Sequence, residues 1–513
     1  MQQDWMQSIQ FPHSITKLEW RETHISQILL TGDWVYKIKK PVDFGFLDFS
    51  TLDKRRYFCE EELRLNRRSA PELYHSVEPL CRAGDHYNFC GEGEVVDYAV
   101  KMRQFDPDSL LQMRMPTLVD QPDFFQSLGY GLAKFHEQAA ISPGDEAFGT
   151  ADAVCFPVDE NFRQILPRLS DQDDIVRVQR IQLWSEEQGK HLSDVFERRK
   201  FQGMIRECHG DLHLGNIALI DEQPVMFDCI EFNERFRWID VASDLAFLVM
   251  DMEFNGYARQ ANGVLNSYLE YSADYDLLSV LNFYRIYRAL VRAKVAVLRM
   301  EQAEAGEAAQ LLDLFRRYLA FAEEAVEITG QYLAITCGVS GSGKSTLARK
   351  LAGASNAIHL RSDVVRKQLV GLKPLDSSEK LDPDNPQLLY SQPYTDNTFQ
   401  QLEQLAGKIL GLGYPVLVDA TFLKSVARFP FMSLAKSVAV PYHIIYLNVP
   451  RSTLVERILK RQQESNDASE AGVQVMEQQL EDFQGFSAEE QRNVISAETD
   501  SDSDSLVVAL LKD

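Results

Sequence analysis

The 513-residue sequence lacks any apolar run near the roughly 18 to 20 residues that a membrane-spanning helix needs. Its first residues also lack the basic segment and apolar stretch of a secretory signal peptide. The seven cysteines are odd in number, scattered, and form no C-x-x-C pair. This pattern is typical of reduced cysteines, so we expect a cytoplasmic protein that contacts no membrane.

Positive charge is also scarce. Lys and Arg together number 53 against 76 Asp and Glu, which gives a formal net charge of −23. An acidic surface repels polyanions and so disfavours nucleic acid as a partner, although a locally basic cleft in the C-terminal part would still accept it. The apolar and charged fractions, 45% and 25%, are those of a folded globular protein. We therefore regard nucleic acid as an unfavoured but not excluded partner, and the sequence is silent on oligomeric state.

Elements are indicated along most of the chain. Residues 28–38 read as a hairpin, residues 95–102 as a strand, and residues 498–505 as a turn that caps a final helix at 506–511. From residue 330 short apolar strands alternate with helical segments, which indicates a parallel sheet covered by helices. The longer predicted helices cover residues 51–68, 124–139, 175–200, 277–300 and 301–328.

The first chemical motif is HGDLHLGN at residues 209–216. Phosphoryl transfer needs a carboxylate that orients the attacking hydroxyl, ligands for Mg²⁺ and a cation on the phosphates. Asp211 is the candidate catalytic carboxylate. Asn216 has the spacing of H-x-D-x-x-x-x-N, and Asp228 ends the apolar run 225–227, so these two are the candidate metal ligands.

A lysine upstream of this motif completes the set. Lys37, on a predicted strand, is the expected phosphate cation, and Lys39 should point to the same side because side chains alternate along a strand. Either Glu61 or Glu62 on the following helix could hold Lys37, and Glu61 is our candidate.

These residues, together with WIDVASDLA at 238–246, resemble the aminoglycoside phosphotransferase and choline-kinase-like family over residues 15–325. The resemblance implies a bilobal protein-kinase-like fold that phosphorylates a small-molecule hydroxyl, with Asp211 as the base. Asp240 and Asp244 are expected to brace the catalytic loop or cap a helix. Two departures are the missing G-x-G-x-x-G loop and a metal triplet, F-D-C, in place of D-F-G. An inactive, nucleotide-binding relative is the rival interpretation.

The second motif is GVSGSGKS at residues 338–345, a complete G-x-x-x-x-G-K-S run between a predicted strand and a predicted helix. That setting is typical of a P-loop, whose backbone N–H groups wrap the phosphates at a helix N-terminus. Lys344 is expected on the β- and γ-phosphates and Ser345 on Mg²⁺. The candidate nucleotide-binding residues are Gly338, Ser340, Gly341, Ser342, Gly343, Lys344, Ser345 and Thr346.

Further residues of this part fit the same chemistry. Asp363, just past a predicted strand, can accept a proton from an acceptor hydroxyl, and Arg366 lies one helical turn further on. Asp419 ends an apolar strand at the position of a Walker-B carboxylate, where it would reach Mg²⁺ through water. Arg457 and Arg461 share one helix face and are candidates for a lid, unless that face is simply solvated.

This second set resembles the P-loop kinases grouped with polynucleotide 5′-kinase, gluconate kinase and zeta toxins, over residues 331–512. The resemblance implies Asp363 as general base and Arg461 as the lid arginine. The predicted fold class is therefore α/β and α+β. A bilobal kinase-like domain spans 1–329, with its N-lobe at about 1–103 and its helical C-lobe at 104–329, and a P-loop NTPase domain spans 330–513.

The function that these motifs indicate is a bifunctional ATP-dependent phosphotransferase, in which each domain binds ATP and Mg²⁺ and phosphorylates a small-molecule hydroxyl. One alternative is a nucleotide-sensing regulatory protein with one catalytic and one non-catalytic site, because almost no linker separates the two parts near Gly330. Another is a nucleic-acid 5′-end kinase through the C-terminal domain. The acceptors, the choice of ATP or GTP, and the coupling between domains do not follow from the sequence.

Overall fold

The computed structural model describes residues 9–45, 47–144, 146–327, 330–382, 386–464, 472–498 and 501–511. By its internal contacts the chain forms two compact units, one of Met1–Asp120 with Phe135–Asp251 and one of Gln121–Lys134 with Met252–Asp513. This division does not test the predicted domain boundary at residue 330, which stays a prediction. Among the described residues, no helix has both the length and the apolar character needed to cross a membrane.

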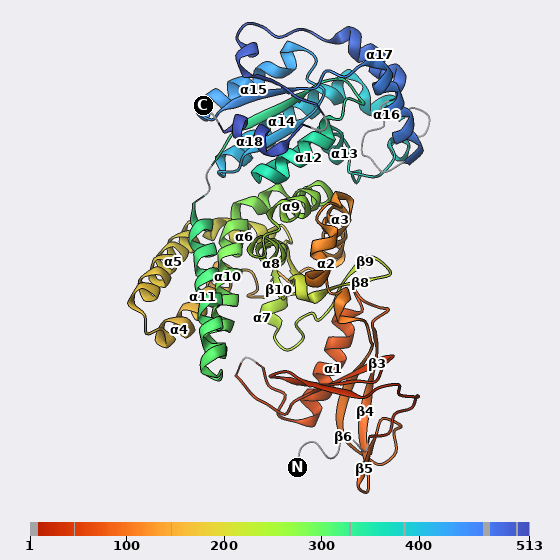
Figure 1. The fold of residues 1–513 in the computed structure, drawn as a ribbon, viewed down its shortest axis with the longest axis vertical. Helices are drawn as coiled ribbons and strands as arrows, with labels where there is room; N and C mark the ends of the chain where they lie inside the picture. Colours follow the sequence, from red (N-terminus) through yellow and green to blue (C-terminus); the bar gives the residue numbers. More distant parts are fainter. Residues whose placement is uncertain are drawn as a thin grey trace. The chain divides into compact units, whose positions relative to one another are not determined.

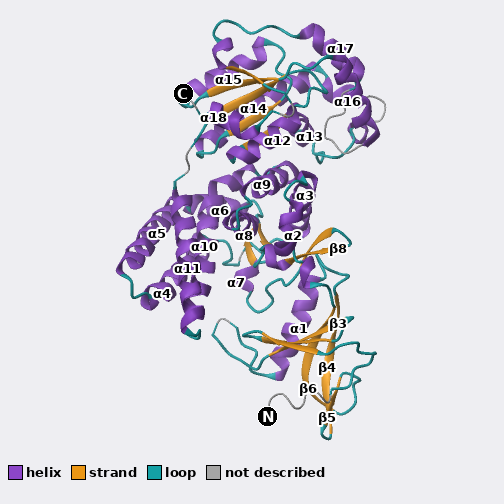
Figure 2. Cartoon of the chain, viewed as in Figure 1, coloured by secondary structure: helices purple, strands orange, loops and turns teal. Residues whose placement is uncertain are grey.

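The first unit begins with an antiparallel sheet in the order β1-β2-β3-β6-β4-β5. Figures 1 and 2 label β3, β4, β5 and β6 of this sheet beside α1. The predicted hairpin is confirmed, since β2 and β3 pair with Leu30 opposite Val35. Helix α1 (Leu52–Asn66) begins at the N-cap Thr51 and packs Cys59 against the sheet. The strands are β1 (Glu19–Glu22), β2 (Ser26–Leu30), β3 (Trp34–Lys39), β4 (Tyr74–Ala83), β5 (His86–Asn88) and β6 (Glu94–Arg103).

The rest of the first unit is mainly helical and carries the first motif in the loop between two short strands, β7 and β8. The predicted helix over 175–200 is two helices that break at Leu192, and α4 was not predicted because Pro157 interrupts its pattern. Two antiparallel pairs, β7 with β10 and β8 with β9, frame the motif. The elements are α2 (Leu111–Leu118), α4 (Ala151–Ile165), α5 (Gln172–His191), α6 (Ser193–Phe201), β7 (Ile205–Glu207), β8 (Ile217–Ile220), β9 (Gln223–Met226), α7 (Glu234–Arg237), β10 (Trp238–Asp240) and α8 (Val241–Phe254).

The second unit contains helices that precede the P-loop in the sequence. α10 and α11 pack along each other (Figure 1), and both were predicted within a few residues of their observed ends. α9 is buried at nine of the ten positions from Ala261 to Glu270, Gly263 being the exception. The elements are α3 (Pro122–Gln138), whose first part belongs to this unit, α9 (Ala258–Ser272), α10 (Leu278–Met300) and α11 (Ala305–Val326).

A parallel sheet in the order β12-β13-β11-β14-β15 follows, which confirms the predicted architecture. Its inner strands are apolar along most of their length because helices cover both faces of the sheet. The strands are β11 (Leu333–Cys337), β12 (Ile358–Arg361), β13 (Val416–Asp419), β14 (Tyr442–Tyr446) and β15 (Val494–Ser496), and the helices are α12 (Lys344–Ser355), α13 (Ser362–Gln368), α14 (Gln392–Gly411), α15 (Ser425–Ser437), α16 (Arg451–Glu464), α17 (Val473–Asp482) and α18 (Ser503–Leu510).

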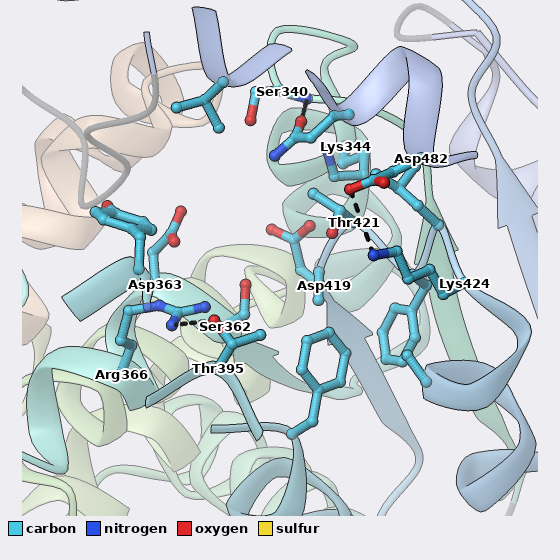
Figure 3. Close-up of a pocket in the computed structure, with 18 of the residues that line it drawn as sticks. Ser340, Lys344, Ser362, Asp363, Arg366, Thr395, Asp419, Thr421, Lys424 and Asp482 are labelled. Atoms are coloured by element: carbon cyan, nitrogen blue, oxygen red, sulfur yellow. Dashed lines mark hydrogen bonds and ion pairs between the residues drawn. The ribbon is translucent and has the colours of Figure 1, made fainter. Parts of the chain in front are cut away.

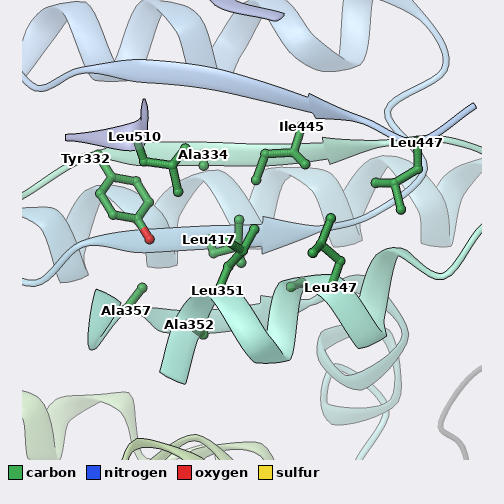
Figure 4. Close-up of a cluster of buried hydrophobic side chains, with 11 residues drawn as sticks. Tyr332, Ala334, Leu347, Leu351, Ala352, Ala357, Leu417, Ile445, Leu447 and Leu510 are labelled. Carbon is green, nitrogen blue, oxygen red and sulfur yellow. The ribbon is translucent and has the colours of Figure 1, made fainter. Parts of the chain in front are cut away.

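The hydrophobic core on one face of this sheet also includes helix α18. Leu347 and Leu351 of α12 pack against Leu417 and Ile445 of the sheet, and Leu510 of α18 joins the same cluster (Figure 4). The predicted final helix is therefore confirmed, with Asp502 as its N-cap. Because β11, β12 and β13 are parallel, the P-loop, Asp363 and Asp419 all follow the same edge of the sheet.

Candidate active sites

Two lysines of β3 share one buried carboxylate. Lys37 Nζ lies 2.8 Å from Glu62 Oε1 and 2.6 Å from Asp228 Oδ1. Lys39 Nζ lies 2.6 Å from the other oxygen of Glu62 and also contacts Glu231. The two lysines point to the same side of the strand, as predicted, and the structure brings Lys37 together with Asp228 across 191 positions of the sequence.

The partner of Lys37 corrects one prediction. Glu61, our candidate, faces Arg64 at 2.9 Å and Arg237 at 3.6 Å, and it is Glu62 that meets Lys37. An α-helix turns by about 100° per residue, so two adjacent glutamates of α1 cannot both face β3. The sequence carried no signal that separates the two.

The charges in this cluster stabilise one another. Burial alone would raise the pKa of Glu62, but Lys37 and Lys39 lower it to about 2. Burial opposes the charge of Lys37, yet Asp228 and Glu62 raise the pKa of this lysine well above its ordinary value. Lys37 and Glu62 are therefore both charged at neutral pH, and removing either takes one of two opposite charges from the one that remains.

The loop after β7 places Asp211 next to Asn216. The Asn216 side-chain amide donates to Asp211 Oδ2 at 3.2 Å and to the Asp211 carbonyl at 2.9 Å. Asp211 keeps 40% of its side chain exposed, and His213 Nε2 lies 3.6 Å from its carboxylate. The Asn216 carbonyl accepts the Phe227 N–H at 3.0 Å, at the base of the β8–β9 hairpin. Asn216 thus connects Asp211 to the strand end that precedes Asp228.

Asp228 has a strained backbone, with a φ of 66°. This left-handed conformation is unfavourable for a residue with a Cβ and is found where surrounding contacts hold it. Its N–H donates to the Tyr74 hydroxyl at 3.2 Å, and its side chain is 44% exposed. Asn216 and Asp228 offer amide and carboxylate oxygens, the ligand type that Mg²⁺ prefers, so these residues fit a metal.

A buried aspartate braces the loop that carries Asp211. Asp244 accepts the N–H groups of His209 and Gly210, each at 2.9 Å, and lies 3.1 Å from His136 Nε2. Gly210 has a φ of 89°, and a Cβ there would come within 2.6 Å of the Phe236 carbonyl, so only glycine fits. Asp244 acts on the loop backbone, in agreement with the bracing role expected from the sequence.

Asp240 forms the other buried pair of this region. It accepts from Arg199 at 2.7 and 2.9 Å and from the Ala242 N–H at 2.9 Å, at the start of α8. It is therefore a capping and ion-pairing residue, which is the second of the two roles expected for these aspartates.

The P-loop backbone is curled by two glycines. Gly341 and Gly343 have φ angles of 83° and 86°, and α12 begins directly afterwards at Lys344. A Cβ at Gly341 would come within 3.0 Å of the Leu454 carbonyl. Lys344 Nζ donates to the Val339 carbonyl at 2.9 Å, inside the loop. This geometry presents the N-terminus of α12 and a lysine to the same point, as anion binding requires.

Asp419 lies buried at the end of β13, next to a hydroxyl and an imidazole. Thr336 Oγ1 donates to it at 3.1 Å, and His359 Nε2 lies 3.6 Å away. Burial alone would raise its pKa, but His359, Lys344 and Ser345 hold the pKa of Asp419 well below its usual range. An ionised carboxylate beside the Ser345 hydroxyl suits Mg²⁺. Thr336 and His359 were not predicted, since neither belongs to a motif.

A cavity of about 1040 Å³ opens at this edge of the sheet, lined by the P-loop, Asp363 and Asp419 (Figure 3). Arg366 also lines it and is 7% exposed. Its guanidinium donates to the Leu389 carbonyl at 2.8 Å and to Thr395 Oγ1 at 3.1 Å. The structure therefore collects Lys344, Asp363, Arg366 and Asp419 around one space, as predicted from their positions in the sequence.

The predicted lid is only partly described. Arg457 of α16 lines the cavity and donates to the Ser342 carbonyl at 3.4 Å. The side chain of Arg461 lies outside the described part of the chain, so its role stays a prediction. Gln479 of α17, which was not predicted, accepts the Ser340 N–H at 2.7 Å.

Uncharacterized proteins of Mycobacterium bovis and Mycobacterium tuberculosis are 30% identical to this chain over 404 residues, which is 78% of this chain and 78% of theirs. The chain belongs to their family. Within it, residues 104–281 match the Phosphotransferase enzyme family and residues 333–486 match an AAA domain. The chain is accordingly a kinase, with one domain of the phosphotransferase type and one of the P-loop type.

Solved structures resemble the two parts separately. Aminoglycoside 2'-phosphotransferase-IIIa is 15% identical and covers 60% of this chain and 94% of its own, with a TM-score of 0.36. A choline/ethanolamine kinase family protein from Mesorhizobium loti is 13% identical over 61% of this chain and 94% of its own, with a TM-score of 0.35. A gluconokinase from Sinorhizobium meliloti is 21% identical over 36% of this chain and 90% of its own, with a TM-score of 0.23.

Proposed function

We propose that this family member is a bifunctional phosphotransferase in which each domain binds ATP with Mg²⁺ and transfers the γ-phosphoryl group to a small-molecule hydroxyl. One observation carries the proposal. At each motif a lysine, an aspartate able to meet an acceptor and oxygen ligands for a metal lie close together in the fold. These are the parts that phosphoryl transfer requires.

At the first site Lys37 would neutralise nucleotide phosphates, with Glu62 fixing its position. Asp211, whose carboxylate is partly exposed and contacted by Asn216, would orient the acceptor hydroxyl and take its proton. Asn216 and Asp228 would hold Mg²⁺. When bound, the metal adds positive charge that offsets charge developing on the phosphates.

At the second site the P-loop N–H groups and Lys344 would hold the phosphates. Asp363 would orient the acceptor, while Ser345 and Asp419 would hold Mg²⁺, the latter as an ionised carboxylate. The cavity of about 1040 Å³ is at the upper end of the roughly 300–1,000 Å³ typical of small-molecule pockets. That size supports a nucleotide bound together with a small alcohol.

A screen with γ-labelled ATP tests the proposal. The full chain is incubated with a library of small alcohols, and labelled products are compared between the parent, Asp211→Asn and Asp363→Asn. Each variant is expected to lose its own products by about 10²- to 10⁴-fold, as for removal of a general base. Asp173→Asn, an exposed aspartate on α5, is the matched control and should lose none.

The outcomes separate the candidate functions. Two product sets, each lost in one variant, would support the bifunctional enzyme. Products lost in only one variant would favour the nucleotide-sensing alternative, with the other site non-catalytic. Full turnover in the double variant would contradict both catalytic assignments.

A further inference from the structure

The backbone of the edge strand β12 and of the residue before it is hydrogen-bonded by side chains of a helix. β12 forms one end of the sheet, where outward backbone groups would ordinarily lack partners. Helix α9 supplies them through two asparagine side chains. Asn266 Oδ1 accepts the His359 N–H at 2.7 Å, and the Ala357 carbonyl accepts from Asn262 at 3.0 Å and from Asn266 at 3.1 Å. These side-chain amides form hydrogen bonds that a neighbouring strand would otherwise form with this edge of the sheet.

The two asparagines belong to a longer polar face. Asn262, Asn266 and Glu270 are spaced by four residues, which places them on one face of α9, and all three are buried. α9 lies within the segment that matches the Phosphotransferase enzyme family, at residues 104–281. β12 lies within the segment that matches the AAA domain, at residues 333–486. The contact therefore joins segments of two different families.

Glu270 is linked to the P-loop cavity by its contact with Arg361. Its Oε2 accepts the Tyr130 hydroxyl at 2.8 Å and lies 3.7 Å from the nearest nitrogen of Arg361, and both charged side chains are 6% exposed. Its backbone carbonyl accepts from Gln368 of α13 at 2.8 Å. Because buried charges need partners, the carboxylate of Glu270 restricts where the Arg361 guanidinium can lie.

Arg361 in turn belongs to the cavity. It is the last residue of β12, two positions before Asp363, and both line the cavity with the P-loop. We infer that Glu270 is a positioning residue of the P-loop site, which holds Arg361 where it stabilises charge on the transferring phosphoryl group. Helix α9 then completes a site that the P-loop segment by itself leaves unfinished. This inference rests on the function proposed above for the second site.

Loss of the Glu270 charge should affect binding of the nucleotide and stabilisation of the transferring phosphoryl group to different extents. The P-loop and Lys344 hold the nucleotide phosphates, so the Glu270→Gln variant should bind MgADP within about twofold of the parent. A displaced Arg361 should weaken binding of a transferring-phosphoryl mimic roughly tenfold, below the loss that follows removal of a whole catalytic donor. Glu270→Asp keeps the charge and should restore most of this binding.

The experiment is titration calorimetry on the full chain with MgADP alone and with MgADP plus aluminium fluoride, the mimic of the transferring phosphoryl group. The P-loop site is identified as the one lost in Lys344→Ala. The measured quantity is the gain in affinity that aluminium fluoride gives at that site. Glu253→Gln is the matched control, because Glu253 accepts from Arg285 at 3.0 Å in a partly buried ion pair of this unit and does not line the cavity.

A reduced gain in Glu270→Gln, with MgADP affinity and the Glu253→Gln gain unchanged, supports the inference. It is overturned by an unchanged gain in Glu270→Gln, by no gain in the parent, or by equal losses in both variants. If Lys344→Ala loses no site, the proposed function fails instead. If Glu270→Gln does not fold, Tyr130→Phe removes one bond to Glu270, and a gain equal to the parent's would overturn the inference.

Discussion

The two candidate phosphate-binding lysines are held in opposite ways. Lys37 meets two carboxylates, Glu62 and Asp228, that come from a helix and from a loop remote in the sequence. Lys344 meets the carbonyl of Val339, five residues before it in its own loop. The first lysine is therefore positioned by charges that tertiary packing assembles, and the second by local backbone.

The difference has an energetic meaning. At the first site folding and chemistry share the same residues, because Glu62 neutralises both Lys37 and the buried Lys39. At the second site Lys344 donates to a carbonyl of its own loop, and the carboxylate whose charge acts on it belongs to Asp419 at the end of β13. Substitutions at the first site should change both the stability of the fold and nucleotide binding. Substitutions in the P-loop should weaken nucleotide binding with little change in stability.

Replacing either lysine by alanine tests this contrast most strongly. Lys344→Ala should weaken nucleotide binding at the P-loop site by about 100-fold, the loss of one or two charge-assisted hydrogen bonds, with little change in thermal stability. Lys37→Ala should weaken the first site and also lower the melting temperature, since Glu62 and Asp228 lose their cation. Calorimetric titration and thermal unfolding of both variants measure the two effects. Equal melting temperatures of the two variants would show that the two lysines do not differ in their contribution to stability.

The adjacent glutamates of α1 provide a matched pair. Glu62→Gln should lower the free energy of unfolding of the first unit by about 3 kcal/mol, because it leaves the buried Lys39 and the partly buried Lys37 short of negative charge. Glu61→Gln should cost less than about 1 kcal/mol, since its partner Arg64 is half exposed and surface ion pairs contribute little. Denaturant unfolding followed by a probe in the first unit measures both. Similar costs would show that Glu62 is not the central partner.

The same charge cluster predicts how stability changes in acid. The folded-state pKa of Glu62 is lowered from 4.5 to about 2, so its contribution is present above pH 4.5 and is lost as the pH falls toward 2. Burial raises the pKa of Glu231, which acts with the opposite sign. The difference in unfolding free energy between the parent and Glu62→Gln isolates the contribution of Glu62 from that of Glu231. That difference should shrink as the pH falls from 4.5 to 2, and a constant difference would contradict the assignment.

Several elements that the sequence pattern missed are short or are interrupted by a proline. β4 contains Pro79 and a register shift next to Leu80, so its alternation is broken, and β15 has only three residues. Pro157 disrupted the pattern of α4 in the same way. Strong periodic elements such as α10 and the strand of Val416–Asp419 were found because burial imposes their pattern.

The amino-acid sequence by itself determined the P-loop, because glycines, a lysine and a helix start act within eight neighbouring residues. It also determined the spacing of Asp211 and Asn216, which one short loop brings into contact. Only the tertiary structure decided that Glu62 rather than Glu61 meets Lys37, and that α9 covers β12. Those choices depend on which face of a helix is turned toward a distant strand, and no local pattern encodes that orientation.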